Sequence, residues 1–258
     1  MKARKRINAV LALAGYSLYR SRRGRTYEHD GLITDHNHEF VRDPHFESAY
    51  RRGVQASHVD YQIEWRTHIA LWAAFTASKL PGDFVECGVN WGFLSSAIME
   101  YLDWNRLNRH FFLLDTFNGL SEELLNEEER AAGAAENSRK MVQRGKYNAD
   151  VETVRNNFSG WQNVKIIQGA VPGTLNQVTA DRVAYLHIDM NCAAPEVAAL
   201  EFFWPKLVPG AMVLLDDYGF PQHEPQKRAI DACAQKLGVM AASLPTGQGL
   251  IIKPAISS

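Results

Sequence analysis

Short apolar segments alternate with longer helix-like segments throughout the last two thirds of this chain. Strands are expected at residues 83–87, 110–114, 164–168, 183–188, 212–215, 239–244 and 249–253. Helices are expected between them at residues 93–102, 150–158, 173–178, 195–207 and 225–237. Because parallel neighbours need a long crossover, this alternation predicts an α/β fold with a doubly wound, seven-stranded, mostly parallel sheet covered on both faces.

The chain before this region divides into two parts. Residues 1–57 are polar and basic, and Gly24, Gly31 and Gly53 interrupt any long periodicity, which indicates an N-terminal extension with helical segments. In residues 61–77, apolar side chains recur every three or four positions, which predicts an amphipathic helix. We therefore expect an extension over 1–57 and one main domain over 58–258.

The formal net charge of −1 conceals an uneven distribution. Eight of the 28 basic residues precede the first acidic residue, Glu28, and the rest of the chain carries 20 basic and 29 acidic side chains. A body of that sign offers no broad field for nucleic acid, so no nucleic-acid partner is expected. The basic N-terminus leaves three interpretations open: a packed terminal helix, a peripheral membrane contact with anionic lipid, or an export signal.

Cysteine usage points to a reducing compartment. Cys87, Cys192 and Cys233 are odd in number and widely spaced, unlike the ligands of a zinc site or the cysteines of a disulfide scaffold. We expect a cytoplasmic protein. The sequence leaves open whether it forms a homo-oligomer, and whether the charged segment 121–150 is a solvated helical face or a lid.

Carboxylates follow two apolar, strand-like runs. Asp189 ends the run that begins at Val183, and Asp216 and Asp217 end the run that begins at Ala211. An open α/β sheet binds ligands at the carboxyl ends of its strands. Crowded carboxylates repel one another and lose hydration, so a hard cation such as Mg²⁺ is the simplest explanation for all three.

A glycine loop follows the first expected strand. Glu86-Cys-Gly88-Val-Asn90-Trp-Gly92 precedes an apolar helix, and its glycines permit a tight turn and close approach of the backbone to a ligand. The spacing differs from the Gly-x-Gly-x-x-Gly of dinucleotide folds, which disfavours a pyrophosphate ligand. Glu86 would repel phosphate, but it could accept hydrogen bonds from an ammonium group.

The next two strands end in residues suited to a nucleoside. Asp115 ends the second strand, where a carboxylate can accept both ribose hydroxyls, and Thr116 and Phe117 would border the same pocket. Gln168 and Gly169 end the third strand, where an amide and a small residue could meet an adenine edge.

Together these motifs resemble the class I S-adenosylmethionine-dependent methyltransferases, whose first strand ends in an acidic-x-Gly-x-x-x-Gly loop and whose second ends in a ribose-binding acid. More narrowly, the chain from about residue 60 onward resembles the macrocin O-methyltransferase family. That resemblance rests on residues 82–89, 114–120, 186–189, 205–210, 216–219 and 245–253. It implies a Rossmann-like class I methyltransferase fold and a Mg²⁺-dependent enzyme that methylates sugar hydroxyls of macrolides.

The resemblance also implies roles for individual residues. The cofactor S-adenosylmethionine would be bound by Glu86, Gly88, Asn90, Gly92, Asp115, Thr116, Phe117, Gln168 and Gly169. Mg²⁺ would be held by Asp189, Asp216 and Asp217. Two positions depart from the family: Asn191 stands where an acid is common, and Trp91 where a basic residue is frequent. Both departures affect which acceptor molecule is expected more than they affect the expected methyl transfer.

The expected reaction moves a methyl group to a hydroxyl of a sugar, polyol or phenolic small molecule. Asp189 could accept the hydroxyl proton directly or through water. The lysine that follows the first metal-binding aspartate in catechol O-methyltransferases is replaced here by Cys192. His187 and His223 are alternative bases, because imidazole titrates near neutrality.

Competing interpretations remain open at this point. The same fold could serve a non-catalytic protein that binds a nucleoside ligand as a sensor or assembly partner. An NAD-linked oxidoreductase is disfavoured because no catalytic Tyr-x-x-x-Lys pair is apparent. Structural roles also compete: Asp115 as a helix N-cap, Glu86 as a buried salt-bridge partner, and Asp216-Asp217 as a turn.

Overall fold

The computed structural model describes residues 7, 9–13, 16, 26–148 and 150–255. The chain forms two compact units, Met1–Glu39 and Phe40–Ser258. The basic residues before Glu28, and the membrane contact or export signal considered for them, lie outside the described residues. In the described part of the chain, no helix has the length and apolar character needed to cross a bilayer.

The larger unit is built on a seven-stranded sheet with the order β5-β4-β3-β6-β7-β9-β8. Five strands run parallel to one another: β3 (Asp83–Cys87), β4 (Phe111–Asp115), β5 (Val164–Gln168), β6 (Val183–Ile188) and β7 (Leu207–Leu215). The last two, β8 (Ala242–Ser243) and β9 (Gly249–Ile252), are antiparallel. The predicted mostly parallel α/β sheet of seven strands is confirmed.

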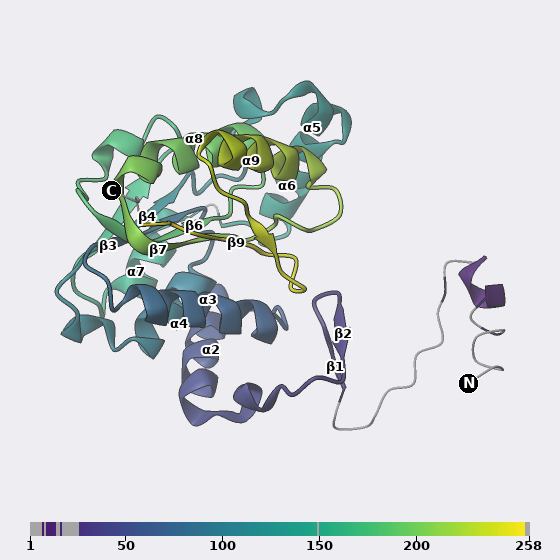
Figure 1. Ribbon diagram of the computed structural model, residues 1–258, viewed down its shortest axis with the longest axis horizontal. Helices are drawn as coiled ribbons and strands as arrows, with labels where there is room; N and C mark the ends of the chain where they lie inside the picture. The colour runs from purple at the N-terminus through teal and green to yellow at the C-terminus, as the bar shows by residue number, and fades with distance from the viewer. Residues whose placement is uncertain (1–6, 8, 14–15, 17–25, 149, 256–258) are drawn as a thin grey trace. The chain divides into compact units, whose positions relative to one another are not determined.

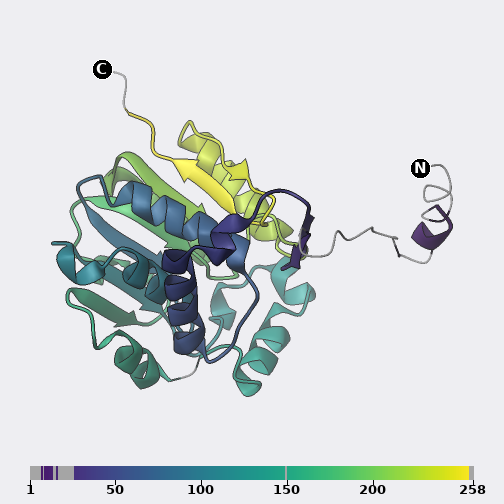
Figure 2. The same cartoon turned by 90° about the horizontal axis from the view of Figure 1, so that it is seen from below.

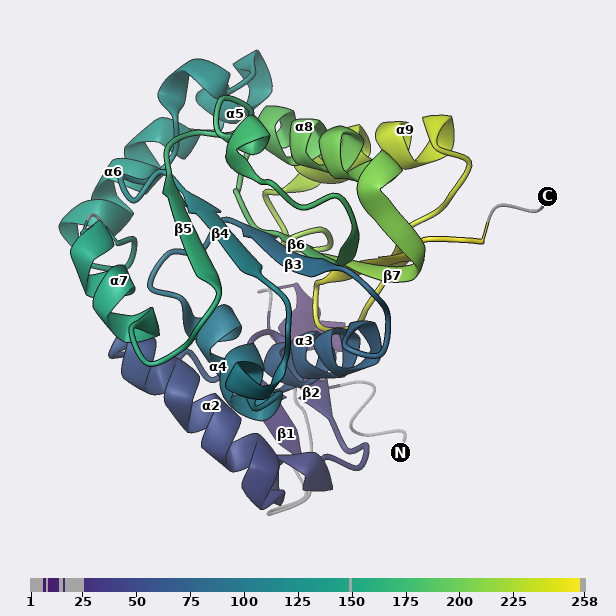
Figure 3. The same cartoon turned by 90° about the vertical axis from the view of Figure 1, so that its left-hand side faces the viewer.

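Helices cover both faces of this sheet, as Figures 1 and 3 show. One face carries α2 (Pro44–Ser57), α3 (Glu64–Ala77) and α4 (Phe93–Tyr101), and Figure 2 looks onto this side. The other face carries α8 (Ala193–Phe203) and α9 (Glu224–Lys236). The shorter helix α7 (Val151–Phe158) precedes β5, and the 3-10 turn η2 (Trp104–Arg106) precedes β4. Their apolar sides enclose a core in which Phe84, Trp104 and Tyr185 are among the largest fully buried side chains.

The helix α2 was not predicted, because Gly53 suggested a break. Its N-terminus is capped by Asp43, whose carboxylate accepts hydrogen bonds from the backbone nitrogens of His45 and Phe46. Gly53 serves close packing: a Cβ atom there would lie 2.9 Å from the ring of Phe93 on α4. Residues 40–57, which the sequence assigned to the extension, therefore belong to the larger unit, where α2 packs against α4.

The described residues of the smaller unit contain a hairpin that the sequence did not predict. It pairs β1 (Tyr27–His29) with β2 (Leu32–Thr34). The 3-10 turn η1 (Glu39–Arg42) follows at the start of the larger unit.

The boundary between α8 and β7 also differs from the prediction. The helix ends at Phe203, a 3-10 turn, η5 (Trp204–Lys206), follows, and β7 already begins at Leu207. Pro209 and Gly210, predicted to separate helix from strand, lie inside β7 where its register with β6 shifts. A bulge tolerates proline because the proline nitrogen has no hydrogen for the ladder. The helix predicted at 173–178 is only the 3-10 turn η4 (Leu175–Gln177).

The charged segment after β4 is helical. It forms η3 (Glu122–Leu124), α5 (Glu127–Ala131) and α6 (Ala134–Gln143). A capping box opens α5: the Asn126 side chain accepts from the Glu129 nitrogen, and the Glu129 carboxylate accepts from the Asn126 nitrogen.

Candidate functional site

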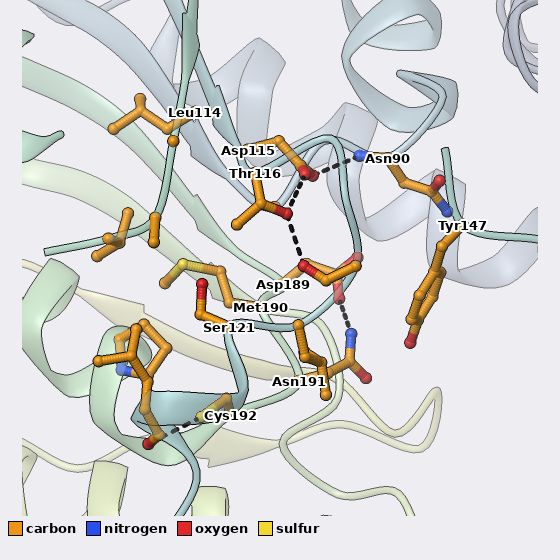
Figure 4. A pocket seen from close by; sticks show the side chains of 18 of the residues that line it. Asn90, Leu114, Asp115, Thr116, Ser121, Tyr147, Asp189, Met190, Asn191 and Cys192 are labelled. Carbon is orange, nitrogen blue, oxygen red and sulfur yellow. Dashed lines mark hydrogen bonds between the residues drawn. The ribbon is translucent and has the colours of Figure 1, made fainter. Parts of the chain in front are cut away.

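A cleft opens at the carboxyl ends of the parallel strands. Strand register brings the ends together, because Cys87 on β3 pairs with Leu114 on β4 and Ile188 on β6. The cleft holds about 730 Å³ of empty space, part of it open to solvent. Its walls include six residues predicted from the sequence: Gly88, Asn90, Asp115, Thr116, Gly169 and Asp189 (Figure 4). This is the position at which open α/β sheets bind ligands.

Gly88 is required by the contact between the glycine loop and the end of β6. Its φ is +94°, and a Cβ atom at this position would lie 1.7 Å from the carbonyl oxygen of Asp189. No side chain fits there without moving one of the two backbones. The glycine therefore sets the separation between the loop and Asp189.

Asp115 holds the glycine loop in place. Its Oδ2 atom accepts hydrogen bonds from the backbone nitrogens of Val89 and Asn90 at 2.7 and 2.8 Å. Its Oδ1 atom accepts from the backbone nitrogen of Phe117 at 2.7 Å. The carboxylate also lines the cleft, so it faces both the loop and any bound molecule (Figure 4).

The segment between β4 and α7 supplies the opposite wall, through Gly119, Leu120, Ser121, Leu124, Tyr147 and Asn148. The Asn148 nitrogen donates to Asn90 Oδ1 at 2.8 Å, and Asn90 Nδ2 donates to the Lys146 carbonyl. Burial raises the pKa of Tyr147, and the charges of Asp189 and Asp217 add to that rise. None of these wall residues was predicted, since the charges around them obscured the apolar and amide positions.

A buried glutamate attaches this wall to the start of α8. Glu129 on α5 is 4% exposed, and its Oε1 atom accepts a hydrogen bond from the backbone nitrogen of Ala193 at the start of α8. The neighbouring Cys192 thiol donates to the carbonyl of Leu124 at 3.4 Å. Both Leu124 and Cys192 line the cleft. The segment left open as a solvated face or a lid is thus docked beside the cleft, with most of its other charges exposed.

The three predicted aspartates converge. Asp189, Asp216 and Asp217 each offer a carboxylate oxygen, and these oxygens lie within 4.8 Å of one another. Asp189 lines the cleft, whereas Asp216 is 3% exposed behind it. Burial and the charge of Asp216 raise the pKa values of Asp189 and Asp217. A hard divalent cation suits this donor set, because it would offset the charges of Asp189 and Asp217, which the protein balances only in part.

Asp216 already has protein partners. Arg66 on α3 places Nη1 2.6 Å from Asp216 Oδ2, and Gln248 donates from Nε2 to Asp216 Oδ1 at 3.0 Å. Burial alone would raise the pKa of Asp216, but Arg66 and the nearby His187 imidazole lower it below the ordinary value. Neither Arg66 nor the role of Gln248 was predicted: Arg66 falls on an amphipathic helix, and Gln248 stood only within a family motif.

His187 and Glu86 form a buried pair beneath the aspartates. Nδ1 of His187 lies 2.9 Å from Glu86 Oε1, and Nε2 lies 3.6 Å from Asp216 Oδ1. Burial would lower the pKa of His187, but the nearby Asp216 carboxylate and the hydrogen bond with Glu86 raise it to about 10. A protonated imidazole between two carboxylates has no lone pair for a substrate proton. Glu86 is 3% exposed and meets His187 rather than the cleft.

Several predicted residues do not line the cleft: Glu86, Gly92, Phe117, Gln168, His187, Asp216, Asp217 and His223. Phe117 is buried in the core, and Gln168 is exposed at the end of β5. His223 lies at the start of α9, with Nδ1 2.8 Å from Gln226 Nε2 and 3.9 Å from Asp217 Oδ2. It therefore lies beside Asp217 of the acidic cluster but does not line the cleft.

The strand order, the glycine loop and the acid after β4 together define a class I S-adenosylmethionine-dependent methyltransferase fold. The macrocin-O-methyltransferase (TylF) family matches residues 68–242, and the chain belongs to that family. The resemblance seen in the sequence is confirmed.

Two curated relatives are also O-methyltransferases. The chain is 28% identical over 165 residues to 8-demethyl-8-(2,3-dimethoxy-alpha-L-rhamnosyl)-tetracenomycin-C 4'-O-methyltransferase of Streptomyces olivaceus, covering 61% of this chain and 57% of the relative. It is 24% identical over 149 residues to mycinamicin III 3''-O-methyltransferase of Micromonospora griseorubida, covering 55% of this chain and 57% of the relative. The matched region thus spans little more than half of each relative.

The fold is shared with the solved structure of the O-methyltransferase NovP. The TM-score is 0.61 at 22% identity, and the match covers 74% of this chain and 80% of the other.

Proposed function

We propose that this chain transfers a methyl group from S-adenosylmethionine to a hydroxyl of a sugar, with Mg²⁺ bound at the acidic cluster. The observation that carries the proposal is the placement of Asp115 and Asp189 in one cleft, at the ends of β4 and β6, the two strands that flank β3. A ribose-binding acid and a proton-accepting acid would then lie on either side of the methyl group. The rhamnosyl group in the name of one relative supports a sugar acceptor.

The glycine-loop side of the cleft would hold the cofactor. Asp115 would accept the ribose hydroxyls, with Thr116 beside it, and Gly88 would let the backbone approach the methionine end. Gly169 would border the adenine. Glu86 is assigned to His187 instead, because its Oε1 atom is committed to the imidazole.

The opposite end of the cleft would hold the acceptor. Methyl transfer is an in-line displacement, so the protein must chiefly align the acceptor oxygen and hold a base beside it. Asp189 is the favoured base, because it lines the cleft and its carboxylate can accept the hydroxyl proton directly or through water. Mg²⁺, held by Asp189 and Asp217, would supply Lewis acidity that lowers the pKa of the hydroxyl.

The test is transfer of labelled methyl from S-adenosylmethionine to a panel of rhamnosides, other glycosides and catechols, with and without chelator. We expect transfer to at least one glycoside, loss with chelator, and recovery when Mg²⁺ is restored. Cofactor binding without transfer to any acceptor would instead favour the non-catalytic binding protein. Absence of cofactor binding by calorimetry would refute both.

A further inference from the structure

Arg66 reaches the acidic cluster from a helix outside the strand-end motifs. Its Nη1 atom lies 2.6 Å from Asp216 Oδ2 and 3.8 Å from Asp217 Oδ1. The guanidinium carbon lies 4.5 Å from the centroid of the Phe220 ring, so the aromatic face also restrains it. The Arg66 side chain is 13% exposed and that of Asp216 is 4% exposed, which limits screening by water.

The three aspartates therefore differ in how their charges are balanced. Both oxygens of Asp216 are engaged, Oδ2 by Arg66 and Oδ1 by Gln248, with His187 nearby. Asp189 is different: its Oδ1 atom accepts a 3.3 Å hydrogen bond from the neutral amide of Asn191. Asp217 lies farther from Arg66 than Asp216 does and is more exposed, at 17%. His223 Nδ1 also lies 3.9 Å from Asp217 Oδ2, so the charge of Asp217 is balanced in part, at longer range than that of Asp216, and that of Asp189 least of the three.

We propose that Arg66 is a built-in counter-cation that reserves Asp216 as a positioning residue and leaves Asp189 and Asp217 to hold one divalent cation weakly. The inference deepens the proposed function, since the cation would be the Mg²⁺ of that reaction. A fixed positive charge beside the site repels a divalent cation, so it lowers the affinity that three free carboxylates would give. Asp216 fixes Arg66, and Arg66 in turn sets how much of the cluster a metal can use.

Arginine suits this role better than lysine. Its guanidinium is planar, remains charged at any ordinary pH, and both pairs with carboxylates and stacks on an aromatic ring. Arg66 lies on α3, which packs against β6 and β7. Its positive charge therefore reaches the aspartates from the face of the sheet and not through the cleft. The cleft is left open for the acceptor.

The experiment is a double-mutant cycle on metal affinity, with Mn²⁺ as the probe and neither cofactor nor acceptor present. Free Mn²⁺ is measured by electron paramagnetic resonance for wild type, Arg66→Met, Asp216→Asn and the double variant. We expect Arg66→Met to bind Mn²⁺ at least tenfold more tightly, because a repelling charge is removed and Asp216 is freed. Asp216→Asn should bind at least tenfold more weakly, because Arg66 is left unbalanced.

The double variant decides between the two roles of Asp216. If Asp216 serves Arg66, removing both should return the affinity to within about threefold of wild type. If Asp216 is itself a ligand, the double variant should stay as weak as Asp216→Asn, which would overturn the proposal. Weaker or unchanged binding by a folded Arg66→Met would overturn it too.

Two further variants serve as controls for this experiment. Arg66→Lys keeps a positive charge and should bind Mn²⁺ within about threefold of wild type. Arg155→Met, which removes an exposed ion pair with Glu152 on α7, is the matched control and should not change the affinity. If Arg66→Met does not fold by circular dichroism, the double variant, in which the unpaired Asp216 charge is also gone, still decides.

Failure of this inference is distinguishable from failure of the proposed function. Methyl transfer that resists chelator, with the Mn²⁺ cycle as expected, would refute the catalytic use of the ion and uphold the role of Arg66. Chelator-sensitive transfer, together with a double variant that binds Mn²⁺ as weakly as Asp216→Asn, would uphold the catalytic use of the ion and refute the role of Arg66. An absence of Mn²⁺ binding in wild type and all variants would overturn the role of Arg66.

Discussion

The carboxylate of Glu129 accepts a hydrogen bond from the backbone nitrogen of Ala193 at 2.7 Å, which joins α5 to the first turn of α8. A carboxylate at a helix N-terminus is favoured by the helix dipole, and burial strengthens the bond. The two residues are 64 positions apart in the sequence, and their contact fixes the position of a cleft wall. It explains why a segment with so many exposed charges is ordered beside the site.

Replacing Glu129 by alanine should loosen that wall. We expect a loss of about 1–3 kcal/mol of unfolding free energy, because the Ala193 nitrogen loses a buried partner. Binding of S-adenosylhomocysteine should weaken several-fold, since Leu124 and Cys192 line the cleft on either side of this contact. Urea denaturation and calorimetry measure the two effects.

The matched control is the adjacent Glu128, whose ion pair with Arg228 is exposed. Glu128→Ala should change the unfolding free energy by about 0.5 kcal/mol or less. Equal effects of the two alanine variants on ligand binding would argue against the docking role of Glu129.

Gly88→Ala should be among the most damaging single substitutions in the chain. The new Cβ atom would collide with the Asp189 carbonyl oxygen, 1.7 Å away, so the loop and β6 must separate. We expect a loss of roughly 3 kcal/mol or more in unfolding free energy, or no soluble protein. Gly133→Ala is the control, with φ +80° and no atom within 4 Å of the added carbon; only backbone strain of about 1 kcal/mol is expected. Similar losses in both variants would show that strain, and not the close approach, dominates.

A buried carboxyl on α8 should make stability depend on pH. Burial and the charge of Asp217 raise the pKa of Glu196 to about 8 from an ordinary value of 4.5. The folded state then holds this proton more tightly than the unfolded state does. Its stabilising contribution is complete below pH 4.5 and is lost as the pH rises towards 8, with a slope of at most about 1.4 kcal/mol per pH unit.

Glu196→Gln mimics the protonated side chain and should remove that loss. Relative to wild type, the variant should gain stability steadily between pH 5 and 8 in urea unfolding measurements. Glu201→Gln, an exposed position on the same helix, should show no such trend. A difference between Glu196→Gln and wild type that stays constant with pH would contradict the raised pKa.

Local sequence patterns predicted the sheet and half of the site. Strand ends can be located from apolar runs, and neighbouring parallel strands place their ends at one edge, so Asp115 and Asp189 could be expected together before the structure. The required glycine at 88 was also recognisable, because it follows a strand directly. Gly88, Asp115 and Asp189 could be predicted because each lies at or just after the end of a strand, and that position determines its role.

The remaining features depend on packing between distant segments. Arg66 looks like a polar position on an amphipathic helix, and only the fold brings it to Asp216, 150 residues away. Gly53 suggested a helix break, whereas it allows α2 to meet Phe93. The pairing of Glu86 with His187 likewise follows from the register of β3 and β6, in which these two residues are direct partners.

The most direct test of the account is the rate of methyl transfer by Asp189→Asn. The amide keeps the shape of the side chain but can neither accept the proton nor contribute charge to a metal, so kcat should fall by about 100-fold or more. Affinity for S-adenosylhomocysteine should stay within about threefold of wild type, and Asp103→Asn, which alters an exposed ion pair with Arg106, should retain full activity. An Asp189→Asn variant that transfers methyl groups at the wild-type rate would contradict the proposal that Asp189 is the base in this cleft.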